Sequence, residues 1–450
     1  MSKYSRYIWV ATFLILQPIY SNADVQKRNV ILYVVDDQGI NDAGCMGNSI
    51  IHTPGLDTLA AAGTQMTHAY CTTPSCSASR SVILSGRYNH ANGQYGHAHS
   101  FHHFKTFDTI KTLPKHLGEA GYRTWSVGKF HVAPESAYPF DKKLGVKAPV
   151  KMAEESRPLI EADSDQPFFL YFCTTEPHRP FKNEGSKPIS PEEVIVPDYL
   201  PDTPESRAEL ARYYMSVERA DSGLLRLIEI LKSSGHWDDT LIIYISDNGI
   251  AFPGAKTNMY EPGVRLPCVV RNPDTVSPPR TSDAMITYAD LLPTILDFTK
   301  LRYDPKNIHG RSFLDHVANP ETSPRDEVFL SHTFHEITKY YPVRVLRERR
   351  YKLIWNIAHG LPFPFASDLY ASDTWQGVLR RGDAVYGKRS VESHIHRAKF
   401  EFYDLEADPD EINNMIDSPE HADRISIMKE KLKTYQKNTN DPWISKWEYE

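Results

Sequence analysis

The chain has 450 residues, of which 40% are hydrophobic and 24% are charged, and its formal net charge is −6. This composition supplies enough apolar side chains for a large core, and the negative balance argues against general nucleic-acid binding, which needs a basic surface. Because no Gly/Ser-rich linker, low-complexity tract or internal repeat divides the sequence, we predict one large domain followed by a smaller one.

The first residues have the pattern of a secretory signal peptide. Lys3 and Arg6 precede an apolar run at 8–16, and small residues at 21–23 form a cleavage site. The run is short for a membrane span, and no later stretch is long and apolar enough to cross a bilayer. We therefore expect a signal peptide over 1–23 and an exported mature protein, periplasmic or secreted, with no membrane span. An uncleaved anchor is the alternative.

A continuous apolar stretch at 29–35 is typical of a strand that is buried on both faces of a parallel sheet. Asp36 and Asp37 follow it directly. Open α/β sheets bind ligands at the carboxyl ends of their strands, and adjacent carboxylates repel each other unless a cation or basic groups lie beside them. Oxygen ligands suit Ca²⁺ or Mg²⁺, so a metal site is predicted here. The alternative is a turn-forming pair before Gly39.

A helix is predicted over 53–60, and a loop rich in serine, threonine and proline follows. The loop carries Cys76 and, four residues later, Arg80 at the start of an apolar run that is predicted to be helical. The unpaired N–H groups at a helix start and a guanidinium beside them would attract an anion. The chain has 5 cysteines, and because this number is odd, at least one of them is unpaired in an exported protein or has a special chemistry. Cys76 is our candidate for that cysteine, and pairing of the other four is left open.

Three further apolar stretches, at 122–127, 167–172 and 240–246, are predicted to be strands, with helices at about 109–119 and 205–232. The polar residues that follow these strands are Lys129 and His131, then His178, then Asp247 and Asn248, with Lys256 shortly beyond. Together with the first strand, four apolar strands end in polar residues of matched chemistry. Such a coincidence is harder to explain by chance than any single ending, and it predicts one site at the sheet edge.

Histidines occur in two places beyond the cysteine loop. Those between residues 92 and 104 have spacings that form no clear metal site, and we expect most of them to be surface or packing histidines. Lys129 and His131 are two positions apart after a predicted strand, so in an extended chain both face one side and could contact one anion. Two exposed polar residues are the alternative.

A strand at 266–270 and a helix at 286–298 complete the larger domain, for which we predict bounds of 24–326. A smaller domain over 327–450 is predicted to hold an antiparallel sheet and a helix, because polar and apolar residues alternate in several short stretches of its sequence. The predicted strands are 343–346, 351–355 and 401–405, and the predicted helix is 425–435. A basic run at 344–352 could face an acidic sugar, although a solvated strand face is the commoner explanation.

These motifs together resemble the formylglycine-dependent sulfatases. The matching motifs are Asp36-Asp37, Cys76-Ser77-Ala78-Ser79-Arg80, Gly128-Lys129-x-His131, Pro177-His178, Ser246-Asp247-Asn248-Gly249 and a late signature at 403–411, in the family's order. The match spans nearly the whole mature chain, and within the family it is most similar to the heparan N-sulfatase branch. The resemblance implies an α/β fold of the alkaline-phosphatase type, with a large, mostly parallel sheet flanked by helices.

The resemblance also implies a cofactor and a modified residue. Cys76 would be oxidised to formylglycine by a maturation enzyme, and its aldehyde hydrate would be the nucleophile. The ligands of one Ca²⁺ would be Asp36, Asp37, Asp247, Asn248 and the modified Cys76. Three carboxylates and one dication would leave the site with a net negative charge of about one. In this scheme Arg80 and Lys129 add the positive charge that makes the site attractive to an anion.

The remaining implied roles concern protons and substrate. His178, with Lys256, would protonate the leaving group, and His131 would take the proton of the remaining hydroxyl as sulfate leaves. We add His102, His335 and Arg344 as substrate-binding candidates. The implied substrate is a sulfated glycosaminoglycan, at the N-sulfate of glucosamine in heparan.

The substrate and the reaction class each leave a second possibility open. Lys256 stands where the heparan N-sulfatase branch has arginine and many O-sulfatases have lysine, so the substrate could instead be an O-sulfate on another glycan. Ala78 stands where proline is usual, which bears on the maturation enzyme more than on activity. The chain could also be a phosphatase or phosphonate hydrolase of the same superfamily, or an inactive sugar-binding protein. The oligomeric state is left open, with a homodimer as one option.

Overall fold

The computed structural model describes residues 28–184, 187–275, 280–322 and 325–449. The predicted signal peptide, 1–23, lies outside the described residues. Within the described ranges, no helix combines the length and the apolar character that crossing a bilayer requires.

An eight-stranded sheet forms the centre of the molecule, in the order β4-β3-β5-β1-β6-β7-β2-β8. Its strands are β1 Asn29–Val35, β2 Thr64–Tyr70, β3 Arg123–Gly128, β4 Lys142–Leu144, β5 Phe168–Cys173, β6 Thr240–Ser246, β7 Cys268–Arg271 and β8 Arg280–Thr287. Strand β7 is antiparallel to β6 and β2, whereas the other neighbours are parallel. The predicted mostly parallel sheet is therefore confirmed.

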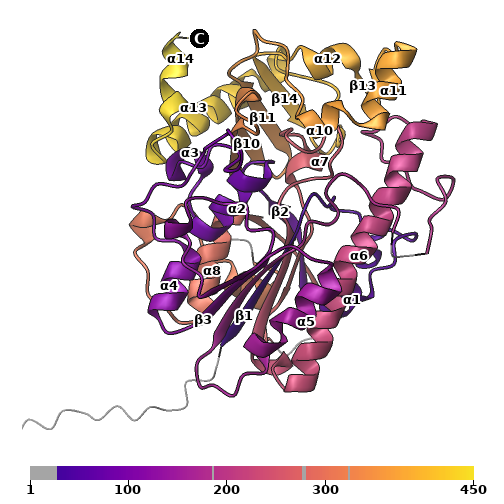
Figure 1. Ribbon diagram of the computed structural model, residues 1–450. Coiled ribbons are helices and arrows are strands. Elements are labelled where there is room, and N and C mark those ends of the chain that lie inside the picture. Colours follow the sequence, from indigo (N-terminus) through magenta and orange to yellow (C-terminus); the bar gives the residue numbers. More distant parts are fainter. Residues whose placement is uncertain (1–27, 185–186, 276–279, 323–324, 450) are drawn as a thin grey trace, which may run out of the picture.

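Helices cover both faces of this sheet (Figure 1). On one side lie α1 Pro54–Ala61, α5 Pro149–Ile160 and α6 Pro204–Ser234, and on the other lie α2 Cys76–Ser85, α4 Leu113–Glu119 and α8 Leu291–Phe298. All seven residues of β1 are buried, because alternate side chains enter the two cores: Val30, Leu32 and Val34 enter one, and Ile31, Tyr33 and Val35 the other.

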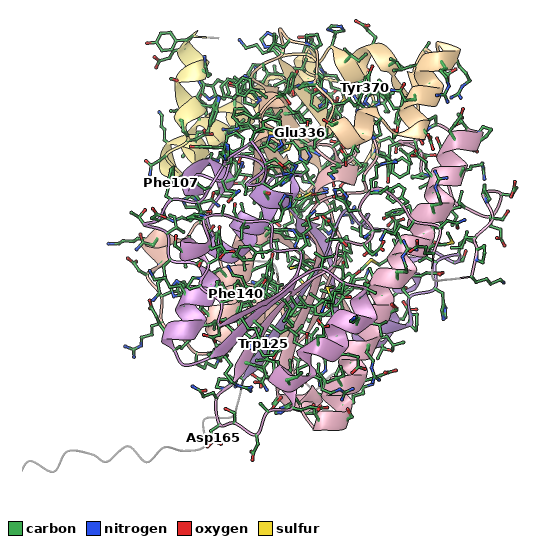
Figure 2. All side chains as sticks on the ribbon, viewed as in Figure 1. Phe107, Trp125, Phe140, Asp165, Glu336 and Tyr370 are labelled. Atoms are coloured by element: carbon green, nitrogen blue, oxygen red, sulfur yellow. The ribbon has the colours of Figure 1, made fainter. Side chains whose placement is uncertain are left out.

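A separate four-stranded antiparallel sheet has the order β14-β11-β10-β9. Its strands are β9 Glu327–Phe334, β10 Tyr340–Glu348, β11 Tyr351–Asn356 and β14 Phe400–Asp404, and α13 Ala422–Asn438 packs on it. In Figure 2, Glu336 and Tyr370 lie in the upper part that holds this sheet, whereas Trp125 lies on β3 of the large sheet and Phe140 lies near it. The short elements are α3 Asn89–Asn92, α7 Glu261–Val264, α9 Leu314–Ala318, α10 Ser367–Tyr370, α11 Asp373–Arg381, α12 Val391–Ile395, α14 Lys446–Tyr449, β12 Val385–Tyr386 and β13 Arg389–Ser390.

The helix predicted over 286–298 is wrong in its first part. Strand β8 continues to Thr287, and the helical segment begins only after it. Thr287 and Asp290 form a capping box, in which each side chain accepts a hydrogen bond from the other's backbone. The boundary is hard to see in the sequence because apolar residues stand on both sides of it, at 284–286 and at 291–292.

Candidate active site

The acidic strand ends meet where the sequence predicts them. Strands β1 and β6 are parallel neighbours in which Val35 pairs with Ser246, so the next residues of both strands emerge side by side. Asp36, Asp37, Cys76 and Asp247 each offer one oxygen or sulfur atom that could bind a metal ion, and these atoms all lie within 4.8 Å of one another in buried residues.

Cys76 is the first residue of α2, so the helix starts four residues earlier than predicted, before Arg80. Its Sγ lies 3.8 Å from Asp37 Oδ1 and is fully shielded from solvent. Burial raises the pKa of the Cys76 thiol well above its ordinary value, although Lys129 and Lys256 oppose this. An unmodified thiol at this position is therefore protonated and a weak nucleophile.

Each of the three carboxylates is paired with a cation. Lys129 Nζ lies 2.6 Å from Asp36 Oδ2, Arg80 Nε lies 2.8 Å from Asp247 Oδ2, and Lys256 Nζ lies 2.8 Å from Asp37 Oδ2. Burial opposes ionisation of Asp36, but Lys129, His178 and Arg80 outweigh it and hold its pKa well below the usual range. Burial raises the pKa of Asp247, and the neighbouring charge of Arg80 opposes this.

The donor set fits a hard divalent cation. Two buried oxygens, Asp36 Oδ1 and Asn248 Oδ1, have no hydrogen-bond partner in the described part of the chain. Carboxylate and amide oxygens are the ligands that Ca²⁺ and Mg²⁺ prefer, and unsatisfied buried oxygens are rare unless a ligand completes them. Asn248 Nδ2 donates to Asp37 Oδ1 at 2.6 Å, which keeps the amide within the cluster.

His178 and Lys256 lie on the other side of Asp37. His178 Nδ1 bonds to the carbonyl of Arg179, so the ring presents Nε2 to Lys256 Nζ at 3.1 Å and to Asp37 Oδ2 at 3.7 Å. Burial and the charge of Lys256 lower the pKa of His178.

Asp368, in the short helix α10, is a site residue that the sequence did not predict. Its Oδ2 accepts a hydrogen bond from Lys256 at 3.1 Å. Burial alone would raise its pKa, but Lys256 and His178 hold the pKa of Asp368 at about 2. No spacing motif marks this residue, because it comes from a short helix more than a hundred residues after Lys256.

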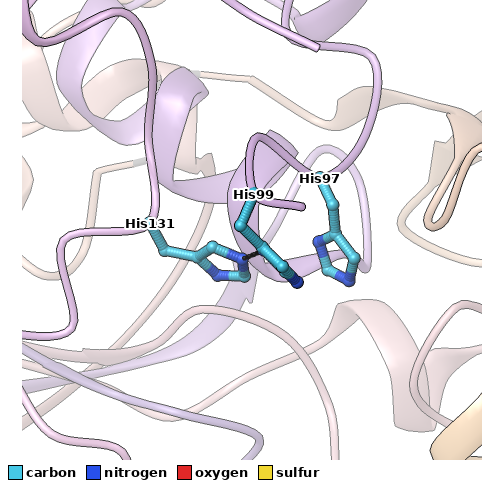
Figure 3. A group of neighbouring side chains, drawn as sticks. All are labelled: His97, His99 and His131. Carbon is cyan, nitrogen blue, oxygen red and sulfur yellow. Dashed lines mark hydrogen bonds between the residues drawn. The ribbon is translucent and has the colours of Figure 1, made fainter. Parts of the chain in front are cut away.

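His131 lies among other histidines (Figure 3). The spacing of the histidines between 92 and 104 indicated no metal site, and in the fold two of them, His97 and His99, meet His131 with nitrogens within 4.8 Å of one another. The prediction of an extended chain through Lys129 and His131 is wrong, because φ is 87° at Gly128 and 52° at His131. Sequence spacing misses this group because two separate loops supply it.

Two of the three substrate-binding candidates lie beside this histidine group. His335 Nε2 is 3.1 Å from His97 Nε2, and the ring centroid of His102 is 5.6 Å from that of His97. Arg344 is not brought to the site. Its guanidinium is fully buried and bonds to both carboxylate oxygens of Asp441, so it is unavailable to a saccharide. All five cysteines are free thiols.

The doubly covered, mostly parallel sheet, with this acidic and basic site at its carboxyl edge, has the alkaline-phosphatase-like fold of known sulfatase structures. A protein in complex with its substrate D-glucosamine-2-N,6-O-disulfate shares the fold with a TM-score of 0.70 and 20% identity, over 92% of this chain and 99% of that one. The phosphonate monoester hydrolase of Agrobacterium radiobacter shares it with a TM-score of 0.70 and 17% identity, over 92% and 96%.

Comparison with known sequences identifies the family to which the chain belongs. The family model described as Sulfatase matches residues 28–156 and 148–301, and the model described as N-sulphoglucosamine sulphohydrolase, C-terminal, matches 254–360. The N-sulphoglucosamine sulphohydrolase of Homo sapiens is 35% identical over 93% of this chain and 92% of its own length. The chain belongs to the sulfatase family and is a hydrolase of sulfate esters or sulfamates.

Proposed function

We propose that this chain is an exported sulfatase that removes the N-sulfate from glucosamine in heparan sulfate or heparin. The observation that carries the proposal is the position of Cys76, at the start of a buried helix and among three carboxylates and three cations. Its similarity to the human N-sulphoglucosamine sulphohydrolase supports this choice of substrate. The basic start and apolar run of the first residues support export.

We infer that Cys76 is oxidised to formylglycine by a maturation enzyme before folding is complete, because its side chain has 0% exposure in the folded chain. The hydrate of this aldehyde would supply two hydroxyls on one carbon, one as the nucleophile toward sulfur and one whose deprotonation would let the ester be released as sulfate. A serine or thiol ester would lack this second hydroxyl.

The neighbouring side chains have separate roles. Arg80 and Lys129 donate hydrogen bonds to the sulfuryl oxygens and stabilise the charge that develops on them. His178 and Lys256, which are 3.1 Å apart, supply the proton to the departing nitrogen or oxygen, and His131 accepts the proton of the second hydroxyl. His102 and His335 are positioned to contact the saccharide.

The acidic cluster would hold one Ca²⁺ per chain through Asp36, Asp37, Asp247, Asn248 and the modified Cys76. When bound, a divalent cation withdraws electron density from the sulfuryl oxygens. Three carboxylates against two positive charges leave a net charge of about −1, so Arg80 and Lys129 are needed to make the site attractive to an anion.

The test is to incubate the matured, calcium-loaded protein with heparan disaccharides that each carry one sulfate. Release of sulfate from the N-position alone is the expected result, and Cys76→Ala protein prepared in the same way is the control. Release from an O-position only would favour an O-sulfatase, since many O-sulfatases have a lysine at the position of Lys256. Hydrolysis of phosphate or phosphonate esters without sulfate release would overturn the proposal.

A further inference from the structure

Three histidines from two loops meet next to the acidic cluster (Figure 3). His97 and His99 lie between α3 and α4, and His131 follows β3. Their ring centroids are 4.8 Å, 5.0 Å and 4.7 Å apart for the pairs 97–99, 97–131 and 99–131. Such mutual proximity of three imidazoles is not explained by apolar packing, since each ring brings two polar nitrogens.

The nitrogens of this group are incompletely satisfied. His131 Nε2 and His99 Nδ1 share one hydrogen bond of 2.7 Å. His97 is 7% exposed, and its Nδ1, like Nδ1 of His131, is buried without a hydrogen-bond partner in the part of the chain that the structure describes. Buried polar atoms of this kind are uncommon in folded proteins and call for a ligand or another specific explanation.

The chemistry of the group differs from that of the acidic cluster. Imidazole nitrogens suit Zn²⁺ and the neighbouring transition metals, whereas Ca²⁺ takes oxygen ligands. Three histidines with one open position form a common zinc arrangement, with Zn–N distances near 2.0–2.1 Å. Tetrahedral geometry then requires ligand nitrogens about 3.3 Å apart. His131 Nε2 and His99 Nδ1 are 2.7 Å apart, so they must separate by about 0.6 Å and give up their hydrogen bond, and Nδ1 of His131 keeps its proton.

Nearby positive charge does not exclude a cation. Lys129, the lysine two residues before His131, is neutralised by Asp36 at 2.6 Å. Lys256 is neutralised by Asp37 at 2.8 Å and by Asp368 at 3.1 Å. Without calcium the histidine group therefore lies beside paired charges. Bound Ca²⁺ would share Asp36 and Asp37 with these lysines, so Zn²⁺ should bind more weakly to the calcium-loaded protein than to the calcium-free protein.

We propose that His97, His99 and His131 bind a transition-metal dication of the Zn²⁺ class, in a site separate from the acidic cluster. Binding places the metal on the imidazole of His131, which then has no free lone pair with which to accept a proton. The cation is therefore an inhibitor of the reaction. This inhibitory consequence rests on the proposed function, whereas metal binding itself does not.

The binding test is a calorimetric titration of the calcium-loaded, full-length protein with Zn²⁺, repeated with Co²⁺ by visible absorption. We expect one ion per chain and a tetrahedral cobalt spectrum. His97→Ala and His99→Ala should each weaken Zn²⁺ binding by at least about tenfold. His103→Ala is the matched control, because this histidine is exposed and lies outside the group, and it should bind as the unmodified sequence does.

Equal Zn²⁺ affinity in His97→Ala, His99→Ala and His103→Ala would overturn the site, as would loss of Zn²⁺ binding in Asp247→Asn alone. Inhibition is measured separately, at saturating Ca²⁺, as the Zn²⁺ concentration that halves sulfate release. His99→Ala should raise that concentration by at least about tenfold. If Zn²⁺ binds through the histidines but does not inhibit, the inhibitory consequence is wrong. Calorimetry reports the site even if the chain releases no sulfate.

Discussion

At the scale of single residues, the charges around Cys76 are balanced without the sulfur. Asp36 forms an ion pair with Lys129, Asp247 with Arg80, and Asp37 with Lys256, and the nitrogen–oxygen distances are 2.6–2.8 Å. The thiol makes only a long contact of 3.8 Å with Asp37. Function and stability are therefore separable at this position, because removing the sulfur leaves every ion pair in place.

Cys76→Ala should lower turnover by at least about a thousandfold, because it removes the nucleophile. Its free energy of unfolding should fall by only about 1–2 kcal/mol, the cost of a small buried cavity. Sulfate release and thermal unfolding of the same preparation measure the two effects. Near-normal turnover would contradict the assignment of Cys76 as the nucleophile.

Asp247→Asn tests the metal ligands. It keeps the shape of the side chain but removes one of three carboxylates, so calcium affinity should fall by about 10–100-fold and sulfate release with it. Calcium calorimetry measures the affinity. Asp404→Asn is the control, because Asp404 pairs with Arg350 outside the cluster and should leave the titration unchanged.

His178→Ala tests the proton donor. A poor leaving group such as an amine needs protonation as it departs, whereas an activated aryl oxide does not. We expect the variant to lose about 10²–10⁴-fold on a glucosamine N-sulfate and much less on an aryl sulfate. Equal losses on both substrates would indicate that His178 binds or positions the sulfate instead.

At the scale of elements, the site depends on how the chain leaves each strand. Sequence predicted β1 and β6 with correct bounds, because a continuous run of buried apolar residues has few other interpretations. It did not predict β2, whose polar and apolar residues are mixed, or the strand part of 286–298. Asp36 and Asp37 could thus be placed from strand ends.

Strand β3 has a specific requirement at its last residue. Gly128 has φ of 87°, and a Cβ added there would lie 2.0 Å from the carbonyl oxygen of Cys173. A side chain would therefore force β3 away from β5 and displace Lys129 and His131, the two proposed catalytic residues that come next. The backbone at Gly128 sets the position of both.

Gly128→Ala should lower the free energy of unfolding by about 1–3 kcal/mol, because of strain and the collision. It should also reduce sulfate release by more than the loss of folded protein accounts for. Gly118→Ala in α4 is the matched control, since an added Cβ there meets nothing within 4 Å and the helix should gain up to about 1 kcal/mol. Chemical denaturation and activity on the same samples decide the outcome.

At the scale of the whole molecule, the active site is shared between distant parts of the chain. Asp368 and His335 come from the segment after residue 326, yet they contact Lys256 and Ser75 at 3.1 Å and 2.9 Å. The sequence can predict that residues which directly follow strands of one sheet lie close together, since parallel strands bring their carboxyl ends to the same edge. It cannot place side chains whose position depends on how a second sheet packs, which is why Asp368 was missed and Arg344 was misplaced.

The prediction that belongs to this scale concerns Arg344 and Asp441, which tie the C-terminal segment to β10. Arg344 Nε and Nη2 lie 2.5 Å and 2.9 Å from the two oxygens of Asp441, and both residues are buried. Asp441→Ala leaves the guanidinium buried and unpaired, so unfolding free energy should fall by about 3–5 kcal/mol. Asp410→Ala, which breaks a surface pair with Lys388, should change the unfolding temperature little.

The effect of Asp441→Ala should depend on pH in a defined direction. Burial opposes ionisation of Asp441, but Arg344 outweighs it and holds the pKa below its ordinary value. A lowered pKa stabilises the fold at any pH above the unfolded value of about 3.9, and that contribution is lost as pH falls toward the folded value. The stability gap between the unmodified sequence and Asp441→Ala should therefore stay constant from pH 7 to about 5 and shrink below about 4. Denaturant unfolding across this range measures it, and a gap that widens in acid would show that Asp441 is not held as an ionised partner of Arg344.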